Sequence, residues 1–132
     1  MSEQNVEIVR AAIAANNRRD WGGVLRGAAP DFELDWSRAI GPYRGVYRLD
    51  QARSLLEMFN EVFESARFEP EEFIDDRETV VVGWTLHTVG RDGIEVSARG
   101  AWLWAFRDRV PVRLCLYQEL GEALEAAGLA VD

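Results

Sequence analysis

The sequence predicts an α+β fold in which helices pack on one side of a curved antiparallel sheet. Helical patterns dominate the first half of the chain, and long runs rich in β-branched and aromatic residues, joined by short turns, fill the second half. This segregation is typical of an α+β domain, whereas regular alternation of strands and helices would indicate a parallel sheet. The 132 residues contain no linker, internal repeat or low-complexity stretch, so we expect a single domain over residues 1–132.

The beginning of the chain predicts two helices and a short strand. Apolar residues recur at helical spacing over 4–17, which indicates an amphipathic helix. Asp20 is placed to cap a short helix over 21–26, which Gly27 can end. Over 32–36, apolar residues alternate with polar ones, and this pattern indicates a half-buried strand.

The strongest helical pattern follows a turn at Gly41-Pro42. We expect Asp50 to cap a helix that continues to Ala66. Its apolar residues keep helical spacing throughout: Ala52, Leu55, Leu56, Phe59, Val62, Phe63 and Ala66. Pro70 then marks a change to strand, and Phe73-Ile74 predicts only a short one.

Three long strands and a short helix complete the predicted fold. The strands cover residues 79–89, 94–107 and 110–119. Gly90 to Gly93 forms the first hairpin turn between them, and Asp108-Arg109 forms the second. A helical tail over 122–127 ends at Gly128.

Alternation along these strands sorts their side chains onto two faces of the sheet. One face is apolar and aromatic, and we expect it to lie beneath the helices. Its members are Phe32, Leu34, Trp36, Val80, Val82, Trp84, Leu86, Ala98, Gly100, Trp102, Trp104, Phe106, Val112, Leu114 and Leu116. The other face is mixed, with Leu103, Cys115 and Tyr117 among polar residues. Such a face often pairs with a second subunit, so we expect a homodimer, and a solvated face is the alternative.

Composition excludes several classes of partner and chemistry. The formal net charge of −8 makes nucleic acid and anionic membrane surfaces poor partners. All fifteen basic residues are Arg, so a Schiff-base lysine and a P-loop lysine are both excluded. A single cysteine rules out an internal disulfide, and no apolar run is long enough to span a membrane. With no signal-peptide pattern at the N-terminus, we expect a cytoplasmic protein.

The order of elements and several short motifs resemble the SnoaL-like branch of the nuclear transport factor 2-like fold, which also holds ketosteroid isomerase and limonene epoxide hydrolase. The resemblance covers nearly the whole chain. It is carried by the helical N-terminus, the turn at 41–45, the strand at 80–87, the turn at 106–108 and the ending at 122–129. It implies a cone-shaped sheet wrapped around the N-terminal helices, a pocket between them, and commonly a homodimer. The fold hosts many functions.

The resemblance also implies where catalytic groups would lie. Relatives of limonene epoxide hydrolase carry an Arg and two Asp residues at positions that align with Gly83, Thr85 and Leu116, and none of these can do that job. SnoaL-like cyclases use a His on the central strand with an Asp on the next. His87 matches the His, but the Asp position falls near Ala101 or Trp102.

The residues themselves offer two candidate catalytic groups. His87 is the only histidine and could act as a general base near neutral pH. Asp35 flanks Trp36, and desolvation by nearby aromatic rings would raise its pKa and suit it to proton abstraction. Alternation places both on the mixed face, so a solvated or hydrogen-bonded strand position is the alternative for each.

The tryptophans are the unusual feature of the sequence. Four of the five share the apolar face, where they would suit a ring-shaped ligand or else fill the cone. We expect the ligand-binding residues to be Trp36, Tyr43, Trp84, Trp102, Trp104 and Leu116. One His and one Cys do not make a metal site, so we expect no metal and no cofactor.

These observations favour a protein that binds a small hydrophobic ligand without strong catalysis. One alternative is an isomerase, cyclase or dehydratase that acts on a hydrophobic ring substrate, with His87 or Asp35 as its base. A second alternative is a structural or partner-binding homodimer whose cone is filled by side chains. The sequence alone does not decide whether the protein is an enzyme.

Overall fold

The computed structural model describes residues 2–129, which contain four helices and six strands. In chain order these are α1 (Ser2–Asn17), α2 (Trp21–Val24), β1 (Glu33–Asp35), β2 (Val46–Arg48), α3 (Leu49–Glu61), β3 (Phe63–Asp76), β4 (Thr79–Gly90), β5 (Glu95–Arg107), β6 (Val110–Tyr117) and α4 (Leu120–Ala126). Asp20 caps α2 as predicted, because its carboxylate accepts a hydrogen bond of 3.0 Å from the Gly23 N–H.

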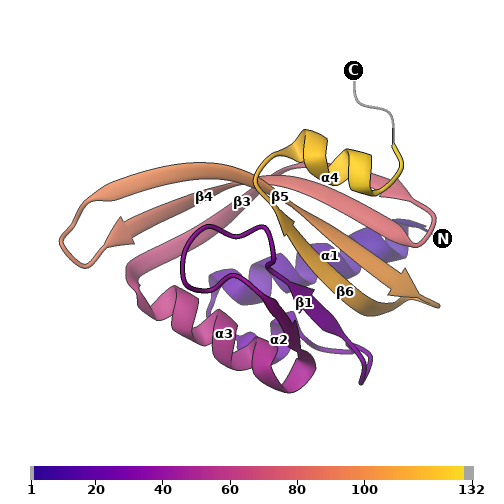
Figure 1. The fold of residues 1–132 in the computed structure, drawn as a ribbon, viewed down its shortest axis with the longest axis horizontal. Helices are drawn as coiled ribbons and strands as arrows, with labels where there is room; N and C mark the ends of the chain where they lie inside the picture. Colours follow the sequence, from indigo (N-terminus) through magenta and orange to yellow (C-terminus); the bar gives the residue numbers. More distant parts are fainter. Residues whose placement is uncertain (1, 130–132) are drawn as a thin grey trace.

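All six strands form one sheet in the order β2-β1-β6-β5-β4-β3. The strands β3 to β6 make the expected antiparallel meander, while β1 pairs in parallel with β6 and antiparallel with β2. The sheet curves over α1, α2 and α3 on its inner side, and α4 lies across its outer side (Figure 1). This arrangement confirms the predicted α+β fold with a curved, unclosed sheet.

The inner face of the sheet holds the main hydrophobic core, as the alternation predicted. Trp84, Trp102 and Trp104 are buried there against residues of α1 and α3. Completely or almost completely buried members of this core include Val9, Phe32, Leu34, Ala52, Val80, Val82 and Trp104. Full burial of each large apolar side chain contributes about 1.5–3 kcal/mol to folding. The two-residue period therefore sets which side chains the helices cover.

A glycine in β5 leaves room for the ring of Trp84 on the neighbouring strand. Gly100 is the register partner of Trp84 across β4 and β5. A Cβ atom at this position would lie closer than 3.0 Å to three carbons of the indole ring. Because real Cβ atoms do not approach so closely, the position of the Trp84 ring depends on the absence of a side chain at residue 100.

The outer face carries a second, smaller apolar cluster beneath α4. Val81, Leu103, Cys115 and Tyr117 are buried there together with Ala123 of the helix, and further apolar residues of α4 pack beside them. The mixed character of this face therefore has an explanation within one chain. The helix covers only part of the face and leaves the polar residues nearer the β4–β5 hairpin exposed.

The boundary between α3 and β3 lies earlier than the sequence predicted. The helix ends at Glu61, so the expectation of a helix up to Ala66 is wrong. Phe63 and Ala66 instead belong to β3, which pairs with β4 from Gly90 back to Thr79. Pairing with a distant strand outweighs the local helical spacing of these residues, a common outcome for a short apolar run.

Pro70 lies inside β3 and does not precede it. The expectation of a short strand at Phe73-Ile74 is therefore also wrong, because the strand runs from Phe63 to Asp76. Two features make this position tolerable. The strand is at the edge of the sheet, where a missing N–H is not needed by a neighbour. The register with β4 also shifts between Pro70 and Glu72, which marks a bulge.

The start of α3 also differs from the prediction. The N-cap is Arg48 and not Asp50, and the side chain of Gln51 accepts a hydrogen bond of 3.1 Å from the Arg48 N–H. The strand β2 comes directly before this cap and was not predicted. Its three residues are too few to show a period in the sequence.

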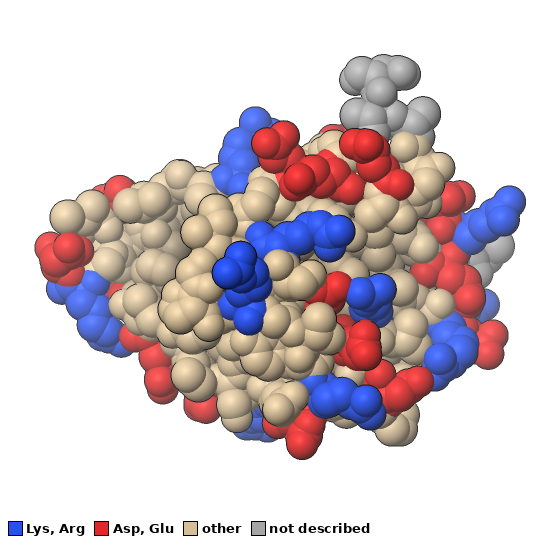
Figure 2. Space-filling model, viewed as in Figure 1, with Lys and Arg blue, Asp and Glu red and all other residues tan. Residues whose placement is uncertain are grey.

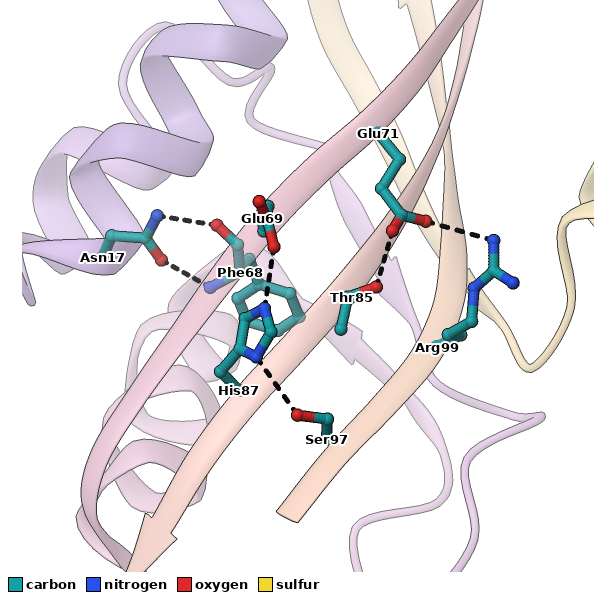
Figure 3. A network of polar contacts seen from close by, with 8 residues as sticks. All are labelled: Asn17, Phe68, Glu69, Glu71, Thr85, His87, Ser97 and Arg99. Atoms are coloured by element: carbon teal, nitrogen blue, oxygen red, sulfur yellow. Dashed lines mark hydrogen bonds and ion pairs between the residues drawn. The ribbon is translucent and has the colours of Figure 1, made fainter. Parts of the chain in front are cut away.

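The outer edge of β3 is closed by a side chain of α1. The Asn17 amide donates to the Phe68 carbonyl oxygen over 2.9 Å and accepts from the Phe68 N–H over 2.8 Å (Figure 3). The amide thus makes the pair of bonds that a neighbouring strand would make. It joins the end of α1 to β3 at the residue whose ring packs against Trp84 and Trp102.

A partly buried ion pair joins β1 to β6. Asp35 has only 6% of its side chain exposed, and it accepts hydrogen bonds from Arg113 and from the Ser37 N–H. Burial acts to raise the pKa of Asp35, but the hydrogen bonds from Ser37 and Arg113 outweigh it and leave that pKa below its ordinary value. The ionised carboxylate therefore stabilises the folded protein.

Substituting Gly100→Ala should lower the free energy of unfolding by about 1–3 kcal/mol, because the new methyl group displaces the Trp84 ring. Urea denaturation measures the loss, and near-ultraviolet circular dichroism reports the changed indole environment. Gly22→Ala is the matched control, since its Cβ would meet neighbours only at the ordinary distance of 3.6 Å. Equal stability of the two variants would show that Trp84 does not need the space.

The lowered pKa of Asp35 predicts a specific loss of stability in acid. A carboxyl group whose pKa is lower in the folded than in the unfolded state stabilises the protein at every pH above the unfolded-state pKa. This contribution disappears as the pH falls below the ordinary value of 3.8 and through the lower pKa of the folded state. Asp35→Asn should therefore be less stable than the wild type at pH 7, and the difference should shrink in acid. Asp31→Asn is the control, because Asp31 pairs with Arg107 at the surface. A difference that stays constant with pH would contradict the ionised role.

Candidate functional site

A cavity of about 200 Å³ lies between the inner face of the sheet and the helices. Its walls come from α1, α2 and α3, from the loop between β1 and β2, and from β3 to β6. The lining residues are Ala12, Asn16, Val24, Trp36, Ala39, Ile40, Tyr43, Leu56, Phe59, Asn60, Phe68, Trp84, Leu86, Trp102, Trp104, Leu114, Leu116 and Gln118. The bulky aromatic residues of the inner face therefore leave a space in the cone.

All six residues that the sequence nominated for ligand binding lie in this wall. Trp84, Trp102 and Trp104 come from the sheet, and Leu116 comes from β6. Trp36 and Tyr43 both lie in the loop between β1 and β2. Their position at the cavity is a geometric result, while their contact with a ligand stays a prediction.

Aromatic rings in edge-to-face and tilted contacts make up much of the wall. On the sheet, the Phe68 ring lies 4.8 Å from Trp84 and 4.6 Å from Trp102, measured between centroids. On the side of α3, Phe59 meets Trp36 at 5.4 Å in an edge-to-face contact. Such pairs add about 0.5–1.5 kcal/mol beyond their burial and hold the rings in place. The wall is therefore held by ring contacts on both sides of the cavity.

The cavity contains almost no ionisable groups. Within residues 2–129, no Asp, Glu, Arg or His side chain lines it, and Tyr43 is the one lining residue that can ionise. The remaining polar side chains in the wall are Asn16, Asn60 and Gln118. Gln118 is exposed and donates to the Arg38 carbonyl oxygen over 3.0 Å. This environment suits a neutral molecule, because an ion would lose its hydration without gaining a partner.

Two buried asparagines of the wall differ in their hydrogen bonding. Asn60 is 2% exposed, and its side-chain amide donates to the Leu56 carbonyl oxygen over 2.8 Å. Asn16 is 4% exposed, and its Nδ2 has no hydrogen-bond partner among the described residues. The indole N–H groups of Trp84 and Trp104 also have no partner within residues 2–129. Sequence reasoning missed both asparagines, and for Asn60 the helical pattern indicates the polar face of the helix, whereas the structure buries it.

His87 lies on the outer face of the sheet and does not line the cavity. Its Nε2 is 2.8 Å from Oε1 of Glu69, and its Nδ1 is 3.1 Å from the Ser97 hydroxyl (Figure 3). The hydrogen bond from His87 holds the pKa of Glu69 below its ordinary value. A parallel contact beside it joins Thr85 to Glu71. The imidazole thus belongs to a row of surface contacts between strands.

Asp35 also points to the outer side of the sheet, where Arg113 and the Ser37 N–H occupy its carboxylate. Its lowered pKa is the opposite of the raised pKa that the sequence suggested for a base desolvated by aromatic rings. Neither Asp35 nor His87 is therefore brought to the cavity. A catalytic role for either residue stays a hypothesis that the geometry of the cavity does not support.

A second hollow, of about 530 Å³, lies on the outer face beside the start of α4. Its wall includes the exposed side chains of Glu71, Glu72, Arg99 and Glu119. Acidic side chains gather over α4 on the same side of the molecule (Figure 2). Among the described residues, no group of three or more His, Cys, Asp or Glu side chains is placed to hold a metal ion. The part of the chain from 2 to 129 also contains no helix that could cross a membrane.

Several solved structures share this fold at low sequence identity. An NTF2-like protein of unknown function from Burkholderia pseudomallei is 24% identical, with a TM-score of 0.77 over 92% of this chain and 95% of that chain. TerC, co-crystallised with polyporic acid, is also 24% identical, with a TM-score of 0.77 over 92% of this chain and 96% of its own. An NTF2-like protein from Burkholderia thailandensis is 21% identical, with a TM-score of 0.76 over 96% and 98%. At such identities the likeness establishes the fold alone.

No curated protein matches the sequence. The comparison with family models does give a match, to the SnoaL-like domain, over residues 9–110. The matched segment runs from α1 to the start of β6 and thus includes most of the elements around the cavity. The extent of this match agrees with the curved sheet and its enclosed helices, and the chain belongs to the SnoaL-like domain family.

Proposed function

We propose that the protein binds a small, neutral, apolar ring compound in the cavity between the sheet and the helices. The observation that carries this proposal is a cavity of about 200 Å³ whose walls are mainly aromatic rings. A dry apolar cavity of about 150 Å³ in another protein already accepts benzene, so one or two fused rings match the space here. The co-crystallisation of TerC with polyporic acid gives a precedent for a small molecule with this fold.

The proposed role is binding and not proton transfer. A general acid or base must lie within hydrogen-bond reach of the reacting atoms. The residues that line the cavity in the described part of the chain supply no carboxylate and no imidazole. An isomerase, cyclase or dehydratase that uses His87 or Asp35 would need its substrate on the other face of the sheet. The binding proposal therefore agrees better with where these groups lie.

The proposal includes a homodimer, formed through the part of the outer face that α4 leaves open. This part carries polar residues of β4 and β5 and the half-buried side chain of Val89, which shares the face of His87. The apolar residues that first suggested a dimer, Leu103, Cys115 and Tyr117, are covered by α4 of the same chain. The expectation of a cytoplasmic location rests on the composition and stays a prediction.

Sedimentation equilibrium at micromolar concentration tests the proposed dimer. We expect a species of twice the 15.0 kDa of one chain. Val89→Glu should shift the equilibrium toward the monomer, because it places charge in the proposed contact on the outer face. Val110→Glu, at the opposite end of the sheet, is the matched control. A wild-type protein of 15.0 kDa would contradict the dimer and leave the binding proposal intact.

Calorimetric titration with tetralin, a bicyclic hydrocarbon, tests the binding function. We expect one molecule per chain, a dissociation constant on the order of 10–100 µM, and a negative heat-capacity change from apolar burial. Leu116→Trp should abolish binding by filling the cavity. Leu124→Trp is the matched control, because Leu124 belongs to α4 and packs on the outer face, away from the cavity.

The same titration separates binding from the proposed catalytic groups. His87→Gln and Asp35→Asn should bind tetralin as the wild type does, since neither residue lines the cavity. If titration of the wild-type protein produces no heat, the result would favour a cavity that the side chains fill in solution. Binding that survives Leu116→Trp would place the ligand elsewhere on the molecule.

A further inference from the structure

The exposure of the lining residues identifies the mouth of the cavity. Among the residues of its wall, only Ile40 and Gln118 are exposed, and the others are buried or half-buried. Ile40 belongs to the loop between β1 and β2, and Gln118 directly follows the last residue of β6. The cavity therefore opens to solvent between this loop and the end of β6.

Hydrogen bonds fix the base of the loop, which stands out as a wide arch (Figure 1). The Trp36 N–H donates to the Gly45 carbonyl oxygen over 2.7 Å, and the Gly45 N–H donates to the Trp36 carbonyl oxygen over 3.2 Å. The same Trp36 oxygen accepts from the Ala39 N–H over 3.0 Å. On the side of β6, the Gln118 amide donates to the Arg38 carbonyl oxygen. Both ends of the arch are thus held in place.

The tip of the loop, residues 40–42, lacks such support. Within residues 2–129, no hydrogen bond joins the tip to a helix or a strand. Gly41 has a φ of 104°, and a Cβ atom added to it would meet no atom within 4 Å, so the space around it is open. The side chain of Ile40 is 84% exposed, more than any other large apolar side chain described. The tip therefore holds an apolar group in water beside an aromatic wall.

A bound ring compound gives this isoleucine an apolar surface to cover. A single exposed apolar residue is ordinary at a protein surface, but Ile40 lies at the rim of the cavity and forms part of its wall. Turning the tip inward over a ligand would remove apolar surface of both from water. Gly41 permits the rotation, because glycine adopts φ angles of either sign at little cost. The tip carries no charge, so its closure removes no ion from water.

We propose that residues 40–42 form a lid, and that Ile40 folds onto a ring compound bound in the cavity and closes its mouth. This inference rests on the proposed binding function and adds the route of entry and the residue that governs release. The hydrogen-bonded base between Trp36 and Gly45 carries the lid, and Gly41 is its hinge. A ligand beneath a closed lid leaves only after the lid opens, so Ile40 acts mainly on the dissociation rate.

The reactivity of a thiol placed on the tip tests the closure. Ile40→Cys creates an exposed thiol, whereas the native Cys115 is 4% exposed and burial raises its pKa to about 11, so it reacts slowly. We expect saturating tetralin to slow alkylation of residue 40 by iodoacetamide about fivefold or more, as the closed state becomes the main population. Ile94→Cys is the matched control, because Ile94 is 60% exposed and does not line the cavity. Mass spectrometry of the alkylated chain measures both rates.

The rate of ligand release tests the role of the isoleucine itself. Ile40→Ser should raise the dissociation rate constant of tetralin about tenfold, because the ligand loses an apolar cover, and the association rate constant should change less. Line-shape analysis of the indole N–H signals in nuclear magnetic resonance spectra measures both constants. Ile94→Ser, which makes the same change away from the cavity wall, should release tetralin as the wild type does.

The two experiments separate failure of the lid from failure of the binding function. Calorimetric titration of each variant first establishes that it binds tetralin. An unprotected thiol at residue 40 in a variant that binds tetralin, or an unchanged dissociation rate in Ile40→Ser, would overturn the lid and leave the binding function standing. Failure of the wild-type protein to bind tetralin would overturn the proposed function together with the lid.

Discussion

The two-residue alternation of β4 and β5 is the constraint on which the rest of this molecule depends. A shift of one residue in β4 would move Trp84 from beneath the helices to the outer face, and a shift in β5 would do the same to Trp102 and Trp104. With the observed register, the indole rings face α1 and α3, whereas Val81, Leu103 and the polar residues of these strands face α4 or solvent. The cavity on one side and the hydrogen-bonded row around His87 on the other are two results of this single pattern.

The partition of charge across the sheet follows from the same constraint. Asp35 and His87 lie outside, where water and ionised neighbours can solvate them, and each has found a partner there. The inside retains amide and indole groups, whose desolvation costs less than that of an ion. A pocket of this kind is suited to holding a neutral molecule in a defined orientation. Within residues 2–129, no carboxylate or imidazole lines it.

Local pattern and long-range pairing explain what the sequence could and could not predict. The faces of the long strands were predictable, because each alternates over many residues and Trp102 and Trp104 mark the buried side without ambiguity. The end of α3 was not predictable, because Phe63 and Ala66 keep helical spacing and only the presence of β4 makes them a strand. The covering of Leu103 and Tyr117 by α4 depends on where the chain returns after β6. For Asn16, the sequence gives the position on the helix, but the missing partner is a property of the packed structure.

The closure of the β3 edge by Asn17 has a consequence for how copies of this protein can meet. An open edge strand offers unpaired backbone groups to any other chain, and it is the usual starting point for runaway strand addition and aggregation. Here the amide of Asn17 occupies those groups at Phe68, and Pro70 and its bulge interrupt them further along. At the opposite edge, β2 offers only three residues. Because neither edge strand offers a long run of free backbone groups, strands of other chains do not add readily to the sheet. Copies of this protein that associate must therefore contact one another through the faces of the sheet.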